Sequence, residues 1–154
     1  MKRLVALSLA LAVNSALCAP QARAHALPHG HAAPQGNNFA QVQIKTTKVA
    51  GNVSMLEGAG GNIGVSAGPD GLLMIDDQFA PLAEKIRAAL RELNPGRLKF
   101  VLNTHWHGDH TGGNAIFGTD STLVAHANVR ARLISGSNLP GRNVPPAPAV
   151  ALPI

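Results

Sequence analysis

Two apolar strand-like segments separated by an amphipathic helix limit this chain to a small set of folds. Residues 72–75 and 98–102 are mostly apolar and rich in residue types that favour strands. Between them, residues 79–93 place apolar side chains three and four apart, with charged side chains on the opposite face. Pro95 and Gly96 end this predicted helix. A helix that connects two buried strands predicts a βαβ unit with a parallel strand pair.

The chain before this unit has the alternation of a short antiparallel meander. Apolar residues alternate with polar or small ones in the stretches 39–49, 53–56 and 63–67. Residues 58–62 contain three glycines but lack the Lys-Ser/Thr ending of a phosphate-binding loop, and no helix follows them. We therefore interpret them as a hairpin turn. The fold class predicted from the whole pattern is α/β.

The strand at 98–102 leads into a loop dense in potential metal ligands, residues 104–113, which we call the histidine loop. Its ligand-type residues are His105, His107, Asp109 and His110. If the chain stays extended, side chains two apart project together, so the first two imidazoles can bind one cation. Gly108 allows a turn that directs the other two side chains toward a neighbouring point. Imidazole and carboxylate ligands suit zinc first, and iron or manganese are also compatible.

Isolated histidines are weaker evidence of metal binding than this cluster. His126 stands alone at a strand end, before a predicted helix at 126–134, and we interpret it as structural. His25, His29 and His31 lie in a segment rich in Ala and Pro, where nothing fixes their geometry for a metal ion. Four ligand-type residues within six positions of the histidine loop instead favour metal binding.

The motif His-x-His-x-Asp-His, preceded by Thr104 and followed by Gly112 and Gly113, resembles the first metal-binding motif of the metallo-β-lactamase superfamily. His110, together with the absence of cysteine after Cys18, makes the chain similar to the branch that includes glyoxalase II-like thioesterases and class B3 β-lactamases. The resemblance covers residues 53–133. It implies the N-terminal half of an αββα sandwich.

The resemblance also implies roles for individual residues. By matching positions, His105 and His107 would bind a first zinc ion, and Asp109 and His110 a second one. Asp109 is also the candidate catalytic residue, because it would orient a metal-activated hydroxide that hydrolyses an ester, thioester or amide bond of a small-molecule substrate. Asp76 resembles a family residue that supports the metal loop without binding metal. Its position is equally compatible with a helix N-terminal acid or a solvated turn.

The later ligands of the family have no counterpart after the motif. The only downstream histidine is His126, and the only downstream acid is Asp120. Two ligands for each ion, rather than three, predict weak metal binding. We therefore expect a truncated hydrolase that is inactive by itself; the alternative is a non-catalytic or vestigial metal-binding domain that lacks the C-terminal ligands. Half a sandwich also leaves one apolar sheet face uncovered, so self-association is expected.

Residues 1–24 have the features of a secretory signal peptide. Lys2 and Arg3 precede an apolar stretch, and a cleavage site of small residues ends at Ala24. The apolar stretch is shorter than the roughly 20 residues of a spanning helix, so we expect no stable membrane anchor. Cys18 suggests a lipoprotein alternative, which the large Leu17 before it disfavours. We expect a secreted or periplasmic protein after cleavage near Ala24.

Cleavage of the signal peptide also changes the charge. Three of the 13 basic residues leave with it while all 8 acidic ones remain, which lowers the formal net charge from +5 to +2. No basic run is left, so nucleic-acid binding is not expected. The expected domains after the signal peptide are a flexible His/Pro/Ala leader at 25–38, an incomplete metallo-β-lactamase-like domain at 39–135 and a Pro-rich irregular tail at 136–154.

Overall fold

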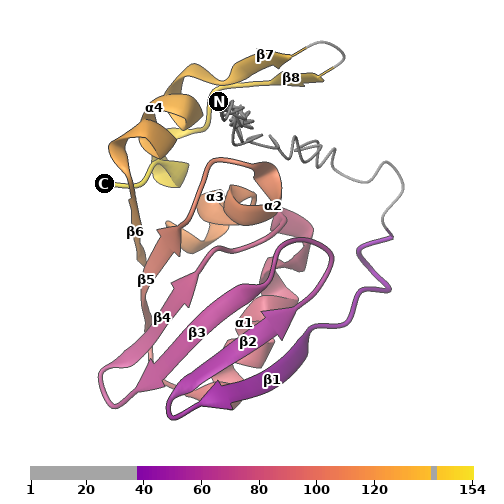
Figure 1. The fold of residues 1–154 in the computed structure, drawn as a ribbon, viewed down its shortest axis with the longest axis vertical. Helices are drawn as coiled ribbons and strands as arrows, with labels where there is room; N and C mark the ends of the chain where they lie inside the picture. The colour runs from indigo at the N-terminus through magenta and orange to yellow at the C-terminus, as the bar shows by residue number, and fades with distance from the viewer. Residues whose placement is uncertain (1–37, 140–141) are drawn as a thin grey trace, which may run out of the picture. The chain divides into compact units, whose positions relative to one another are not determined.

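The computed structural model describes residues 38–139 and 142–154, and its main element is a mixed six-stranded sheet in the order β1-β2-β3-β4-β5-β6 (Figure 1). Strands β1 to β4 pair antiparallel, and β4, β5 and β6 pair parallel. The predicted meander and parallel pair are therefore confirmed. The strands are β1 Lys45–Ala50, β2 Val53–Glu57, β3 Ile63–Gly68, β4 Gly71–Ile75, β5 Leu98–Asn103 and β6 Thr122–Ala125.

The two longest helices, α1 Ala83–Leu93 and α4 Ala127–Ser135, lie where the sequence predicts helices. The shorter ones are the 3-10 turn η1 Ala80–Leu82, α2 Gly108–Thr111 and α3 Asn114–Phe117. Nδ1 of His126 accepts a hydrogen bond of 3.1 Å from the backbone N–H of Asn128 at the start of α4. A side-chain acceptor at this position caps the helix, so the structural interpretation of His126 is confirmed.

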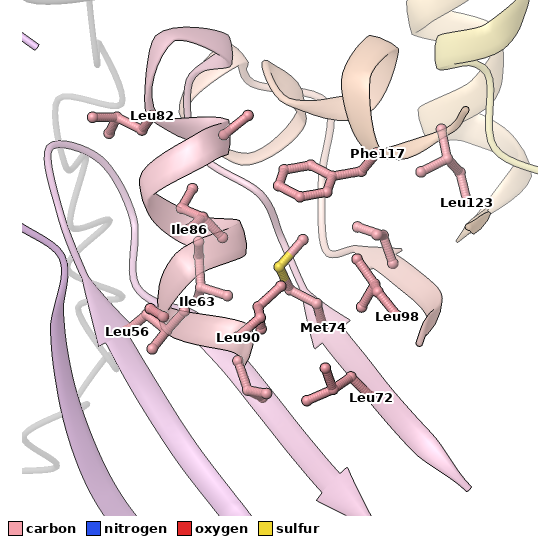
Figure 2. Packing of buried hydrophobic residues seen from close by; sticks show 14 residues of the cluster. Leu56, Ile63, Leu72, Met74, Leu82, Ile86, Leu90, Leu98, Phe117 and Leu123 are labelled. Atoms are coloured by element: carbon pink, nitrogen blue, oxygen red, sulfur yellow. The ribbon is translucent and has the colours of Figure 1, made fainter. Parts of the chain in front are cut away.

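One face of the sheet packs against α1 and forms the hydrophobic core (Figure 2). Because successive side chains of a strand point to opposite faces, Leu72 and Met74 of β4 point into the core while their neighbours do not. Ile86 and Leu90, four apart on α1, are buried on the facing side of the helix. Phe117 of α3 is also fully buried and extends this core toward the carboxyl ends of the parallel strands.

The prediction that strand structure begins near Phe39 was wrong. The backbone turns at this point, with the N–H of Gln41 bonded to the carbonyl of Asn38 at 2.9 Å, and β1 begins only at Lys45. The ammonium of Lys85 on α1 donates to three carbonyl groups of this segment, those of Phe39, Ala40 and Val42, at 3.0, 2.7 and 2.6 Å. The ammonium group of Lys85, more than 40 positions away, thus bonds backbone carbonyl groups that a neighbouring strand would otherwise bond. Alternation within the segment cannot reveal such a distant contact.

The prediction that residues 136–154 form an irregular tail was also wrong for three short stretches of this segment. It contains the hairpin strands β7 Ser137–Leu139 and β8 Arg142–Val144 and the 3-10 turn η2 Ala149–Ala151. Pro153 is fully buried, and the N–H of Ile154 donates to the carbonyl of Leu123 in β6 at 2.9 Å. Elements of three residues are too short for a periodic signal, and their stability comes from contacts distant in sequence.

The predicted signal peptide at 1–24 and the leader at 25–38 lie outside the described residues, apart from Asn38. Within the ranges that the structure does describe, none of the helices has the length and apolar character needed to cross a membrane.

The face of the sheet opposite α1 carries partly exposed apolar side chains. Val53, Leu73 and Phe100 lie in one register row across β2 to β5, and no other part of the described chain covers them completely. Phe100 is 42% exposed, and Ile75 on the same face is 39% exposed. Exposed apolar surface of this kind favours association with other surfaces of the same character.

We therefore predict that the protein self-associates through this face and that Phe100→Glu reduces the association. The charged side chain would have to be desolvated in any contact between two such faces. Light scattering after size exclusion measures the effect. Ile134→Glu is the control, because Ile134 is exposed on α4 and not on the sheet. A wild-type protein that is monodisperse and monomeric contradicts the prediction.

Candidate metal centre

The histidine loop lies at the carboxyl end of β5, where parallel α/β sheets commonly place their sites. After β5 the backbone bends over residues 104–107, and His107, in extended conformation, directly precedes α2. The ring centroids of His105 and His107 are 4.8 Å apart, and those of His105 and His110 are 4.0 Å apart. The three predicted imidazoles are therefore brought together.

Asp109 and His110 have the spacing of two ligands of one ion. Oδ2 of Asp109 and Nε2 of His110 are 3.3 Å apart. Two ligands at about 2.0–2.1 Å from a tetrahedral zinc ion would themselves be separated by roughly 3.3 Å. The spacing of this pair is therefore compatible with two ligands of one divalent cation.

Asp76 orients His110 by contacting the ring nitrogen opposite the one that faces Asp109. Its Oδ2 lies 2.8 Å from Nδ1 of the imidazole, which leaves Nε2 directed toward Asp109. The same carboxylate accepts hydrogen bonds from the backbone N–H and the hydroxyl of Thr104, at 2.8 and 2.7 Å. Carboxylates that hold the second nitrogen of a histidine ligand fix its tautomer and ring orientation. Of the two interpretations left open by the sequence, the structure selects the one in which Asp76 supports the loop.

The backbone at Asp76 has an unusual conformation that belongs to this arrangement. Asp76 and Gln78 have φ values of 62° and 54°, in a region that side chains other than glycine rarely adopt. The chain reverses direction here after β4, which turns the Asp76 carboxylate toward the histidine loop. Such strain persists only where surrounding contacts fix it, and it is common at functional sites.

Gln78 was not singled out by the sequence and connects the glycine-rich loop, residues 58–62, to the site. Its side chain is fully buried, accepts from the N–H of Ala59 at 3.2 Å and donates to the carbonyl of Gly61 at 2.6 Å. A Cβ added at Gly61 would collide with the ring of His110. Residues 58–62 are a hairpin turn as predicted, and their glycines allow the backbone to lie directly against a candidate ligand.

Asp77, next to the supporting acid, is fully buried and only half satisfied. Its Oδ1 accepts from the N–H of Gly113 at 2.9 Å, while Oδ2 has no hydrogen-bond partner. Burial raises the pKa of Asp77 to about 8, the Gly113 hydrogen bond opposes this shift, and the charge of Asp76 adds to it. Near neutral pH the carboxyl group is therefore mainly protonated in the folded protein.

Two further features of His105 favour a neutral imidazole with a free Nε2, the form that binds metals. Burial lowers the pKa of His105, and the neighbouring His110 and His107 lower it further. Nδ1 of His105 lies 3.1 Å from the hydroxyl of Thr104, which can accept a hydrogen bond from Nδ1–H and leave Nε2 available as a ligand.

The donor set is nevertheless incomplete. Within residues 38–139 and 142–154, no group of three or more His, Cys, Asp or Glu side chains is arranged to hold a metal ion. Catalytic zinc normally takes three ligands from the protein. The chemistry of the four side chains fits a divalent cation, and the Asp109–His110 spacing fits it too. Their arrangement provides partial coordination only.

The sequence comparison identifies the family. The profile of the Metallo-beta-lactamase superfamily matches residues 46–135, more than half of the chain. The chain therefore belongs to the metallo-β-lactamase superfamily. No curated protein sequence matches it.

Solved structures show the same fold over part of their length. MEM-A1, described as a subclass B3 metallo-beta-lactamase isolated from a soil metagenome library, is 26% identical with a TM-score of 0.60, and the match covers 73% of this chain and 46% of that one. BJP-1, a subclass B3 metallo-beta-lactamase of Bradyrhizobium japonicum, is 24% identical with a TM-score of 0.59, covering 76% and 47%. Rm3 metallo-beta-lactamase is 27% identical with a TM-score of 0.55, covering 67% and 42%. The chain thus spans less than half the length of these structures and matches part of their fold.

The buried Asp77 predicts a specific pH dependence of stability. Because its pKa is raised on folding, the folded state binds more protons than the unfolded state between about pH 4 and pH 8. The free energy of unfolding contributed by this group therefore falls as pH rises through that window. From pH 5 to pH 8 the loss is on the order of 4 kcal/mol.

Urea unfolding at both pH values tests this with Asp77→Asn, which keeps the acceptor for Gly113 and cannot ionise. The variant is expected to lose less stability than wild type between pH 5 and pH 8. Asp70→Asn, at an exposed position, is the matched control and should follow wild type. If the free energy of unfolding changes equally with pH in wild type and in Asp77→Asn, the raised pKa of Asp77 is contradicted.

The contact between Gly61 and His110 predicts that Gly61→Ala displaces the imidazole from Asp76. We expect a loss of about 1–3 kcal/mol in the free energy of unfolding from overpacking, together with weaker zinc binding. Gly68→Ala is the control, since a Cβ there meets nothing closer than 3.9 Å. Chemical denaturation and zinc titration of both variants measure the two effects. If the two variants behave alike, Gly61 does not position His110.

Proposed function

We propose that this chain provides part of the active site of a secreted zinc-dependent hydrolase that cleaves an ester, thioester or amide bond in a small molecule. The single observation that best supports this is the ligand-like spacing of 3.3 Å between Asp109 and His110, with His110 oriented by Asp76. Membership of the superfamily and structural similarity to subclass B3 metallo-beta-lactamases support the same reaction class.

His105 and His107 would hold one zinc ion through their imidazoles, and Asp109 and His110 a second one. Zinc held there would lower the pKa of a bound water to about 7 and would polarise the carbonyl oxygen of the substrate. Asp109 would accept a hydrogen bond from the attacking water and so orient it toward the substrate. Asp76 remains behind His110 and holds the proton on Nδ1 through the 2.8 Å contact.

A non-catalytic metal-binding domain is the second candidate. It is favoured by the lack of any three convergent ligands in the part of the chain that the structure describes. Such a domain would bind zinc weakly through the same four residues and would not turn over substrate. Both candidates predict metal binding at the histidine loop, so turnover of the native product separates them.

We predict that the purified chain binds zinc reversibly and with less than one tightly held ion per molecule. His107→Ala should weaken the affinity by at least about tenfold, because it removes a direct ligand. His126→Ala is the control, since the side chain of His126 caps α4. Isothermal titration calorimetry gives both affinities. Equal zinc affinity for wild type and His107→Ala would contradict the ligand assignment.

Hydrolysis is tested with nitrocefin and S-lactoylglutathione. The chain by itself is expected to hydrolyse neither faster than buffer, because two ligands leave each ion poorly fixed. The native product that contains this sequence, purified from the cells that make it, is expected to carry stoichiometric zinc and to turn over a substrate from an ester, thioester or amide panel. A native product without turnover would favour the non-catalytic candidate.

A further inference from the structure

Two buried asparagines form a closed hydrogen-bonded pair beside the histidine loop. Asn103 ends β5 and Asn114 begins α3, and they are 6% and 1% exposed. Nδ2 of Asn103 donates to Oδ1 of Asn114 at 3.1 Å, and Nδ2 of Asn114 donates to Oδ1 of Asn103 at 2.9 Å. We call these two residues the amide pair.

The remaining hydrogens of the amide pair point to two different parts of the chain. Nδ2 of Asn103 also donates to the carbonyl of His110 at 3.2 Å, and Nδ2 of Asn114 also donates to the carbonyl of Ala151 at 3.0 Å. A side-chain amide has two N–H donors, so both donors of each residue are used. Reversing either amide would place donor against donor, so the network fixes its own orientation.

Ala151 belongs to the C-terminal turn, residues 148–154, which docks beside the site. Ala151 is 5% exposed, and η2 packs against α3. The turn is held independently of the amide pair by Arg130 of α4, whose Nη1 donates to the carbonyl of Pro153 at 2.6 Å. The N–H of Ile154 donates to the carbonyl of Leu123 in β6. A segment far from the histidine loop in sequence thus has its own attachments to the fold.

We propose that the amide pair couples the docking of the C-terminal turn to the position of His110, so that zinc binding and docking of the turn stabilise each other. This inference rests on the proposed function, because it takes His110 as a zinc ligand. Asn103 and Asn114 are positioning residues. They act on the candidate ligand through its backbone, while Asp76 acts on its ring.

The coupling follows from the cost of an unsatisfied donor in a buried place. If the C-terminal turn leaves, the amide of Asn114 loses its acceptor at Ala151 and must turn to another partner, because an unsatisfied donor is costly. Rotation of that amide toward solvent would break its reciprocal bonds with Asn103, and Asn103 would then lose its fixed orientation toward His110. Linkage is reciprocal, so a zinc ion that fixes His110 must stabilise the docked turn by the same factor.

The first test uses Asn114→Asp in the full chain, which keeps the shape of the side chain but replaces the donating nitrogen with an oxygen. The carboxylate cannot donate to Asn103 or to Ala151, and we expect zinc affinity to fall about tenfold by calorimetry. Asn128→Asp is the matched control, because Asn128 is exposed on α4. Equal affinities for the two variants would overturn the coupling.

A second variant loosens the turn without touching the amide pair or the histidine loop. Arg130→Met removes the bond to Pro153, and Arg132→Met on the same helix is its control. Coupling predicts weaker zinc binding for Arg130→Met than for Arg132→Met. A purely local role of Asn114 predicts no difference between them, and that result would overturn the proposal.

Hydrogen exchange in the metal-free protein provides a readout that does not depend on zinc. Asn114→Asp and Arg130→Met are both expected to speed exchange of the His110 amide, which is bonded to the carbonyl of His107 at 3.0 Å. In wild type, added zinc is expected to slow exchange of the Ile154 amide. If wild type binds no zinc, the proposed function fails, and unchanged His110 exchange in both variants overturns the coupling separately.

Discussion

The carboxylate of Asp76 is the interaction on which the candidate site depends. It joins the end of β4 to the loop after β5 through hydrogen bonds to Thr104 and to the imidazole of His110. The side chain of Asp76 is only 5% exposed, so its charge is stabilised by these donors and not by water. Without it, the imidazole of His110 and the hydroxyl of Thr104 would lose the partner that orients them.

The rest of the structure supports that arrangement from three directions. The parallel pair β4–β5 brings Asp76 close to the histidine loop, and α1 holds this pair from the core side. Gln78 places the glycine-rich loop against His110. Asn103 fixes the backbone of His110 and connects it through Asn114 to the C-terminal turn. The candidate ligands are therefore held by buried polar contacts, which are costly to leave unsatisfied.

Local sequence predicted the elements and the ligand cluster because both leave regular or dense signals. Period-two alternation placed β2 and β3, apolar runs placed β4 and β5, three-and-four spacing placed α1, and the histidines marked the loop. The supporting contacts join residues that are 28 positions apart for Thr104 and Asp76 and 37 apart for Asn114 and Ala151. No local pattern encodes such pairs. The same reason explains why a strand was wrongly predicted to begin at residue 39, where Lys85 bonds the backbone carbonyls. It also explains why the C-terminal turn was predicted to be irregular.

Zinc K-edge X-ray absorption of the full chain with one equivalent of zinc shows whether the histidine loop holds the ion. Binding at this loop predicts imidazole scattering at about 2.0–2.1 Å that is lost when His105, His107 and His110 are all replaced by alanine. The other four histidines of the chain remain in that variant and serve as the internal control. An unchanged spectrum would mean that zinc is held elsewhere, and it would contradict the assignment of the metal site to the histidine loop.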